Sequence, residues 1–379
     1  MGCSWCYYLG WIGFIAWAAY AVFIVRFLHN LYHRKLLYLR EMDPNMQAKY
    51  QATSRYDISN LNEYKLYLGG MFLLPFRVIR ALPLLIILYI LVWIPKLIFN
   101  VNLKNNQEPR GKFYLKWVTG VFVMIKPLLY LLGMQGLWYR KVRINDYIAS
   151  YKPKQDTKVA PVVVSNHSSW MDMFYFMNKN VSFLAKDSVA TTPYIGMFAI
   201  ARQCIFVDRS NEADRQRVIE AIHTKVERVM SHGDVSPILI FPEGTVANGR
   251  TLMRFKRGAF ASKHPIKIYV LRYNPGGNQI VNTISNISDY YSLILFLCQF
   301  RNTLEVIEFE DNFDPLWAFE KHKVDPNSPE SWTVVAQEVK ELMMVASGYQ
   351  SVETSSEETK DFYKQCLEYN KQLLQKKVV

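Results

Sequence analysis

The sequence predicts an α/β domain whose central, largely parallel or mixed sheet is flanked by helices and preceded by membrane-embedded N-terminal helices. Three observations predict this class. Short β-branched runs alternate with helix-like segments through residues 141–350, as in folds built from βαβ units. An uncharged apolar run of 21 residues, Trp5–Val25, lies near the N-terminus. Half of all residues are hydrophobic and 15% are aromatic, more than a soluble domain of this length needs.

The chain is strongly basic, because its 45 Lys and Arg residues exceed its 32 Asp and Glu residues by 13. Such a charge suits nucleic acid, an anionic membrane surface or a polyanionic small molecule. The long apolar segments favour a phospholipid membrane and phosphorylated ligands, so we expect no nucleic acid partner. The five cysteines are scattered, and the lone C-x-x-C of Cys3 and Cys6 has no second pair. We therefore expect neither a disulfide framework nor a metal site.

Residues 1–30 are expected to form a transmembrane anchor, followed by a polar linker over residues 31–65. The run Trp5–Val25 is long enough to cross a hydrocarbon core of about 30 Å. Basic residues such as Arg26 and Arg34 follow it and none precedes it, which indicates that the rest of the chain lies on the cytosol-like side. The alternative is a buried core helix. Signal and transit peptide features are missing, which favours the endoplasmic reticulum over the mitochondrial inner membrane.

Residues 66–140 are expected to be membrane-embedded or interfacial helices. Two short apolar arms, Leu66–Phe76 and Ala81–Pro95, flank Arg77 and Arg80. Each arm is shorter than a simple span, so the pair suggests a re-entrant hairpin or two embedded helices. A single tilted span is an equally good alternative.

The next apolar segment, Phe113–Trp138, contains two lysines and a proline and resembles an interfacial helix lying on the bilayer. Residues 141–350 then form the α/β domain. Residues 351–379 are expected to form a charged C-terminal helix, which begins at the capping box Ser355-x-x-Glu358.

Within the domain, hydrophobic periodicity places each element. Strands are expected at Val162–Ser165, Val181–Ala185, Cys204–Asp208, Pro237–Phe241, Lys267–Arg272, Ile280–Ser285 and Thr303–Phe309. Helices are expected at Ser169–Met177, Pro193–Arg202, Asn211–His232, Asp289–Phe300 and Pro329–Gly348.

A His-x4-Asp pair follows the first of these strands. His167 lies at the strand-to-helix turn, Ser168 or Ser169 is a ready N-cap, and Asp172 lies early in the helix. Because His167 precedes the helix, the chain can fold back and bring the carboxylate to the imidazole. A carboxylate on one ring nitrogen fixes the tautomer and raises the basicity of the other, which makes a general base for a hydroxyl proton. The alternative is a buried histidine with a structural aspartate.

Two further polar residues follow strands. Arg209 lies just beyond a strand and at a helix start, where a guanidinium beside free N–H groups suits a phosphate. Its alternative role is a surface ion pair with Asp208 or Asp214. Glu243 lies at the tip of a Pro-Glu-Gly turn, where it would bind substrate hydroxyls or orient the base. The alternative is a turn residue without a role.

A cluster of cations follows Glu243 within fifteen residues and includes Arg254, Lys256 and Arg257. Clustered cations beside a helix start suit a polyphosphate. The alternative is an ordinary solvated face.

Taken in order, these motifs resemble the glycerolipid acyltransferase family of the His-x4-Asp type. The chain is most similar to its lysophosphatidylcholine or lysophospholipid acyltransferase branch. The similarity covers roughly Leu66–Tyr349 and includes His-Ser-Ser-Trp-Met-Asp, Phe-Val-Asp-Arg-Ser, Ile-Phe-Pro-Glu-Gly-Thr, Phe-Lys-Arg-Gly-Ala-Phe and Val-Leu-Arg-Tyr.

The resemblance implies acyl transfer from acyl-CoA, as a co-substrate and without a cofactor, to a hydroxyl of a lysophosphatidylcholine-like or lysophosphatidic acid-like acceptor. It implies that His167 is the base and Asp172 its partner. It also implies that the substrates are held by Arg209, Glu243, Gly244, Thr245, Arg254, Lys256 and Arg257.

The sequence departs from the family pattern in two ways. The fourth motif usually has a proline in its strand, where this chain has Ile268-Tyr269-Val270. Animal members of this branch carry C-terminal EF-hands, which this sequence lacks, and this argues against calcium regulation. Two rival functions remain: a structural subunit of a larger membrane-protein complex that retains the fold, and acyl exchange between phospholipids without CoA.

Overall fold

The computed structural model of the chain describes residues 4–36, 44–45, 50–53, 58, 60–98, 111–192, 195–208, 212–233, 235–273 and 289–355, together with positions 358, 359, 361, 362, 364, 365 and 368. The predicted strand Ile280–Ser285, residue Arg209 and most of the predicted C-terminal helix lie outside this set.

A mixed sheet of seven strands forms the centre of the domain, with the order β1-β8-β7-β2-β5-β3-β4. Its strands are β1 (Met134–Val142), β2 (Val162–Ser165), β3 (Ser182–Lys186), β4 (Ile205–Val207), β5 (Ile238–Ile240), β7 (Ile266–Tyr273) and β8 (Asn302–Phe309). Neighbouring strands run parallel except β7 and β8, which are antiparallel. A separate pair joins β6 (Thr251–Leu252) to β9 (Gln350–Ser351). The predicted fold class is confirmed.

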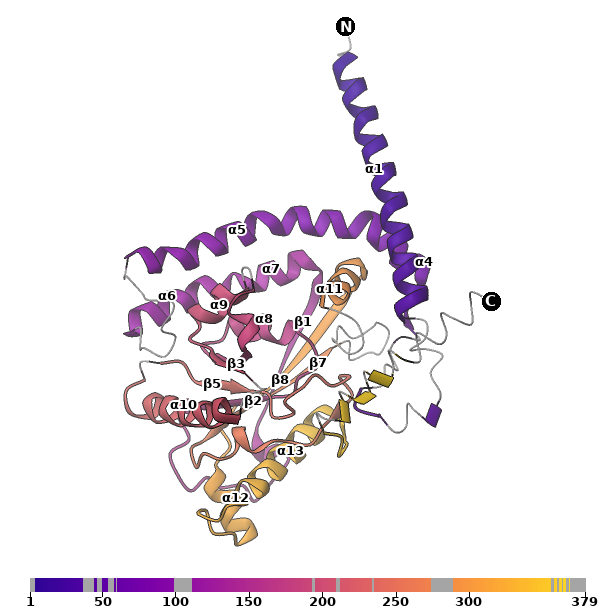
Figure 1. Cartoon of the computed structure of the whole chain (residues 1–379). Helices are drawn as coiled ribbons and strands as arrows, with labels where there is room; N and C mark the ends of the chain where they lie inside the picture. The colour runs from indigo at the N-terminus through magenta and orange to yellow at the C-terminus, as the bar shows by residue number, and fades with distance from the viewer. Residues whose placement is uncertain are drawn as a thin grey trace.

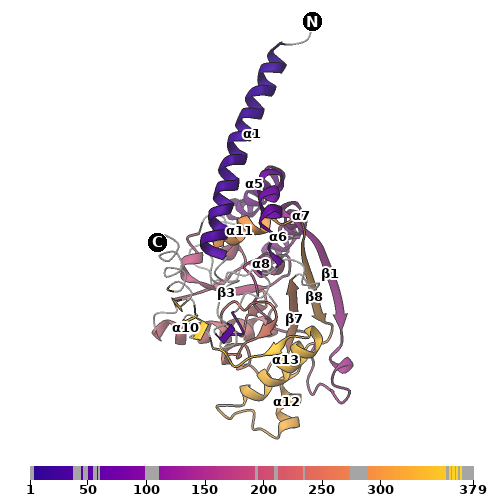
Figure 2. The same ribbon diagram turned by 90° about the vertical axis from the view of Figure 1, so that its right-hand side faces the viewer.

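Helices cover both faces of the sheet (Figure 1). One layer contains α5 (Leu74–Ile98), α6 (Gly111–Val123), α7 (Ile125–Leu132), α8 (Met171–Met177), α9 (Ile195–Ala201) and α11 (Asp289–Cys298). The other contains α10 (Glu212–Ser231), α12 (Pro315–His322) and α13 (Trp332–Ser347). Helices α1 (Ser4–Leu31) and α4 (Glu63–Leu68) lie at one end, and α1 projects away from the domain (Figures 1 and 2).

Strand β2 is buried on both faces of the sheet, which explains its continuous β-branched run. Val163 belongs to the apolar cluster under the α5–α9 layer, whereas Val162 and Val164 belong to the cluster under α10, α12 and α13. All three are at most 4% exposed. A strand buried on both faces has no solvent side, so its side chains do not alternate in polarity.

The structure corrects the prediction of an interfacial helix over Phe113–Trp138. Helical structure ends at Leu132, and β1 begins at Met134 and pairs with β8. Gly133 separates the two with a φ of 112°, a left-handed conformation that ends helices and favours glycine. The sheet therefore begins inside the segment 66–140, ahead of the predicted domain start at residue 141.

The structure also decides between a hairpin and a single span around the paired arginines. The segment from α4 through the π-helical turn Gly69–Leu73 to α5 is helical without interruption from Glu63 to Ile98. The re-entrant hairpin is therefore wrong, and one long helix is present. Within the described residues, three helical segments are long and apolar enough to cross a membrane: Tyr8–Arg34, Glu63–Ile94 and Phe113–Leu132.

Arg77 joins this long helix to α11. Its guanidinium is buried and donates hydrogen bonds of 2.7 Å to the carbonyls of both Leu297 and Gln299. The last carbonyls of a helix have no partner within the helix, so an arginine there both satisfies them and complements the dipole. Gly133 packs against the same guanidinium, because a Cβ there would lie 2.5 Å from its central carbon.

We expect Arg77→Gln to destabilise the protein strongly, because hydrogen bonds to charged groups contribute about 1.5–3 kcal/mol each. Thermal unfolding in detergent, followed by circular dichroism, measures the loss. Arg80→Gln is the matched control, since Arg80 lies on the same helix, is exposed and contacts only the Phe76 ring among the interactions described for it. Equal stability of the two variants would contradict the role of Arg77.

Candidate active site

The structure brings His167 and Asp172 together. His167 follows the end of β2 and Asp172 lies in the first turn of α8, so the intervening turn folds the chain back on itself. Nδ1 of His167 lies 2.8 Å from Oδ2 of Asp172. The imidazole side chain is 18% exposed, whereas the carboxylate is fully buried. Because a carboxylate of this kind only accepts, Nδ1 carries the proton and Nε2 carries the lone pair.

The carboxylate of Asp172 is fixed by three further donors. Oδ2 accepts from the backbone N–H groups of Ser168 at 2.9 Å and Ser169 at 3.0 Å. Oδ1 accepts from the hydroxyl of Tyr273 at 2.5 Å. The predicted serine N-cap is replaced by this arrangement: the N-cap of α8 is Trp170, whose side chain makes no capping bond, while Ser169 Oγ accepts from the N–H of Met171.

Tyr273 is the residue that the sequence analysis missed, although the Val-Leu-Arg-Tyr motif containing it was noted. It ends β7, which pairs with β2 in the sheet although Tyr273 lies 101 residues beyond Asp172 in the sequence. Burial, reinforced by the neighbouring Asp172 carboxylate, raises the pKa of Tyr273 well above its usual value. The phenol therefore stays protonated and donates to Asp172 at all physiological pH values.

We expect Tyr273→Phe to lower kcat about 10-fold or more while leaving KM for the acceptor unchanged, because the variant loses one hydrogen bond to a buried charge. If Tyr273 positions Asp172 against His167, a shift in the pH profile of kcat would accompany this loss. Tyr349→Phe is the matched control, because the Tyr349 hydroxyl donates to the backbone carbonyl of Leu271 instead. Identical kinetics for both variants would rule out a positioning role.

The backbone and ring of His167 are also held in place. Its ring stacks on Phe241 with centroids 4.1 Å apart and an interplanar angle of 11°. Its N–H donates to Glu243 Oε1 at 2.9 Å, and its carbonyl accepts from the N–H of Ala247 at 2.8 Å. The imidazole is thus oriented by the segment that follows β5 and by Asp172 of α8.

Glu243 lies beneath this turn and is 1% exposed. Its second oxygen, Oε2, accepts from the N–H of Met253 at 3.0 Å, so both carboxylate oxygens bind backbone. The side chain therefore connects the His167 turn to the loop that carries the cations. Burial raises the pKa of Glu243 from 4.5 to about 7, against the opposing effect of the two N–H donors and His167.

This raised pKa predicts a pH dependence of stability. Between pH 4.5 and about 7 the unfolded chain loses the Glu243 proton while the folded chain keeps it, so the folded state becomes less stable as pH rises. The total effect is at most about 3 kcal/mol at 1.36 kcal/mol per pKa unit. We expect the unfolding temperature of Glu243→Gln, relative to that of the unmodified protein, to rise across this pH range. A relative unfolding temperature that does not rise over this range would mean that the carboxylate is ionised in the fold.

Two of the cations expected to bind phosphate, Lys256 and Arg257, lie in different surroundings. Lys256 lies over Gly244, since its side chain would be 3.1 Å from a Cβ at that glycine, and its N–H donates to the carbonyl of Pro242. Arg257 instead lines a cavity of about 220 Å³ with His223 of α10. Both side chains are exposed.

The remaining predicted site residues are placed as follows. Arg254 is exposed on the loop after β6, and Thr245 is half-buried in the turn after β5. Arg209 lies outside the described residues, in the segment between β4 and α10. Because β3, β5 and β2 are parallel, the segments that follow them share one edge of the sheet.

Comparison with known proteins gives consistent results. Residues 141–273 match the family model described as Acyltransferase. Lysophospholipid acyltransferase LPEAT2 of Arabidopsis thaliana is 31% identical over 204 residues, which are 54% of this chain and 34% of the relative. Lysophosphatidylcholine acyltransferase 1 of Homo sapiens is 28% identical over 293 residues, which are 77% of this chain and 50% of the relative. The chain thus spans only a third to a half of the length of these relatives.

Among solved structures, the crystal structure of the 1-acyl-sn-glycerophosphate acyltransferase PlsC of Thermotoga maritima matches 71% of this chain and 97% of that chain. It does so with 16% identity and a TM-score of 0.39.

The sheet, the strand-end histidine and the matched segment define residues 141–273 as an acyltransferase domain. The relatives that the chain resembles are named as lysophospholipid and lysophosphatidylcholine acyltransferases, which supports a glycerolipid acyltransferase family near the lysophosphatidylcholine acyltransferase branch. With its three long apolar helices the chain is a membrane protein.

Proposed function

We propose that this protein transfers an acyl group from acyl-CoA to the free hydroxyl of a lysophospholipid. The observation that carries this proposal is the His167–Asp172 contact of 2.8 Å, with the imidazole partly exposed and the carboxylate fully buried. Four donors converge on that carboxylate, so the imidazole is held in one tautomer with the lone pair of Nε2 available. The names of the curated relatives support a lysophospholipid acceptor.

In the proposed reaction, Nε2 of His167 takes the proton of the acceptor hydroxyl as its oxygen attacks the thioester carbonyl. Asp172 stabilises the imidazolium that forms. When the tetrahedral intermediate collapses, the carbon–sulfur bond breaks and the imidazolium proton goes to the thiolate of CoA. The products are the diacyl phospholipid and free CoA, and His167 returns to its neutral state.

The surroundings of the dyad suit these two substrates. Exposed cations at Arg254 and Lys256 provide charge for the phosphates of CoA, whose three phosphate groups are polyanionic. The apolar helices α5, α6 and α7 pack on the same face of the sheet as α8, so the domain lies against the bilayer from which acceptor and acyl chain would enter. The endoplasmic reticulum is the proposed membrane.

The experiment is an assay of the full-length protein, purified in detergent, against a panel of lysophospholipids with labelled acyl-CoA. We expect labelled diacyl phospholipid with at least one head group, and we expect its formation to require acyl-CoA. Product formed without CoA would favour exchange between phospholipids. No turnover with any acceptor, together with fixed-stoichiometry co-purification with other membrane proteins, would favour a structural subunit.

A further inference from the structure

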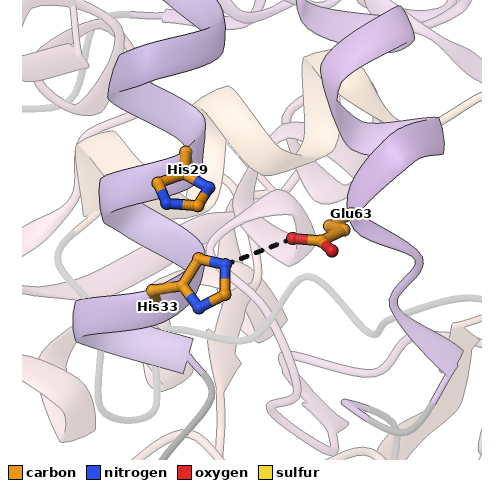
Figure 3. Close-up of side chains that lie close together, drawn as sticks. All are labelled: His29, His33 and Glu63. Carbon is orange, nitrogen blue, oxygen red and sulfur yellow. Dashed lines mark hydrogen bonds and ion pairs between the residues drawn. The ribbon is translucent and has the colours of Figure 1, made fainter.

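Three side chains converge where the projecting helix α1 meets the rest of the protein. His29 lies near the end of α1, His33 lies one turn later in the π-helical segment Tyr32–Leu36, and Glu63 is the first residue of α4 (Figure 3). Each side chain offers one ligand atom, and the three atoms all lie within 4.8 Å of one another. No other such group of three is present among the described residues.

The spacing of two of these atoms already matches a metal site. Nε2 of His33 lies 3.2 Å from Oε2 of Glu63. Two ligand atoms that are each about 2.0–2.1 Å from a tetrahedral ion lie about 3.3 Å apart. The imidazoles of His29 and His33 have centroids 4.2 Å apart, because residues four apart lie on the same face of a helix. A rotation of the His29 side chain would bring its ligand atom from within 4.8 Å to the distance that the other two atoms already have.

Tyr67 contacts two of the three ligands, Glu63 and His29. Its hydroxyl donates to Oε2 of Glu63 at 3.0 Å and lies 2.9 Å from Nδ1 of His29. A phenol has a single proton, so when it donates to Glu63 the contact with His29 requires Nδ1–H as the donor. His29 is then the neutral tautomer with its lone pair on Nε2. Metal-binding histidines in proteins commonly donate their second N–H to an oxygen in this way.

The ligand types and their exposure indicate which ion would bind. Two imidazoles and one carboxylate suit Zn²⁺ and similar transition ions, whereas Mg²⁺ and Ca²⁺ prefer oxygen ligands alone. The side chains of His33 and Glu63 are 38% and 29% exposed, so an ion can enter without unfolding. With three protein ligands, a water molecule would fill the fourth position of a tetrahedral site.

We propose that His29, His33 and Glu63 form a Zn²⁺-binding site that cross-links α1 to α4. Residues 8–17 of α1 are exposed, and among the side chains described in this helix the first buried one is Ala21. A metal at this position would fix the base of the projecting helix and hence its direction (Figure 1). The expectation of no metal rested on Cys3 and Cys6 and did not consider histidines. This site is independent of the proposed acyltransferase reaction.

The test uses full-length protein in detergent, stripped with a chelator and titrated with Zn²⁺ in competition with a chromophoric chelator. We expect one Zn²⁺ per chain. Tyr67→Phe should weaken binding by about 10–100-fold, the usual effect of removing a partner that orients a ligand. His29→Ala and His33→Ala should each weaken binding by more than that. Co²⁺ in place of Zn²⁺ should give visible absorption bands in the unmodified protein but not in His29→Ala or His33→Ala.

His264→Ala is the matched control, because Nε2 of His264 also lies 2.9 Å from a glutamate, Glu227, but is not part of a group of three ligands. It should bind Zn²⁺ as the unmodified protein does. Zn²⁺ should also raise the unfolding temperature of the unmodified protein but not that of His33→Ala. The proposal is overturned if the unmodified protein takes up no stoichiometric Zn²⁺, or if both histidine variants bind it with unchanged affinity.

Discussion

His167→Ala is expected to abolish measurable acyl transfer while the protein still folds and inserts into membranes. The imidazole is the proposed general base, and proton transfer by a positioned base contributes about 10²–10⁴-fold to a rate. The ring is partly exposed and stacks on Phe241. Its removal leaves no buried polar group without a partner, because Asp172 Oδ2 keeps its two backbone donors. The measurement is product formation from labelled acyl-CoA at saturating acceptor.

The matched control for this variant is His223→Ala, which removes a histidine from α10, on the opposite face of the sheet from α8. We expect His223→Ala to keep its kcat within about 2-fold, in line with substitutions away from a site. Full activity of His167→Ala, with unaltered membrane insertion, would remove the chemical basis of the proposed function.

Asp172→Asn is expected to lower kcat by about 10²–10⁴-fold with little loss of stability. The amide oxygen can occupy the place of Oδ2 and accept from His167, Ser168 and Ser169, while the amide nitrogen donates to Tyr273. The variant therefore preserves the hydrogen bonds and removes only the negative charge that stabilises the imidazolium. The pH profile of kcat should shift, because the base loses its charged partner.

Asp172→Ala provides the comparison for stability. It leaves the N–H groups of Ser168 and Ser169 and the hydroxyl of Tyr273 without their acceptor in a fully buried position. Each such group costs about 1–3 kcal/mol, so thermal unfolding should occur well below that of Asp172→Asn. An Asp172→Asn enzyme with unchanged kcat would show that the carboxylate serves only to hold the turn.

Short sequence patterns predicted the features that depend only on residues close together in the chain. The β-branched run before His167 predicted β2 with its correct bounds, and the His-x4-Asp spacing predicted that the two side chains meet. The strand β1 was missed, because its apolar residues continue those of the preceding helix and only Gly133 marks the change. What makes β1 a strand is its parallel pairing with β8, more than 150 residues later.

Contacts that are distant in sequence were beyond prediction for the same reason. Tyr273 reaches Asp172 across 101 residues, and Arg77 reaches the end of α11 across 220 residues. Nothing local in either residue distinguishes it from the other tyrosines and arginines of the chain. The histidines His29 and His33 are four apart and visible as a pair, but Glu63 joins them only through the packing of α4 on α1.

Val163 points to one face of the sheet, and Val162 and Val164 point to the other. The helix layer that contains α5–α9 and the layer that contains α10, α12 and α13 therefore both pack on strand β2. Neither half can loosen without uncovering one side of that strand, so the domain should melt as one cooperative unit. The position of His167, which follows the end of β2, therefore depends on both helix layers. A detergent that separates the apolar helices from the sheet would then abolish the activity without contacting the imidazole.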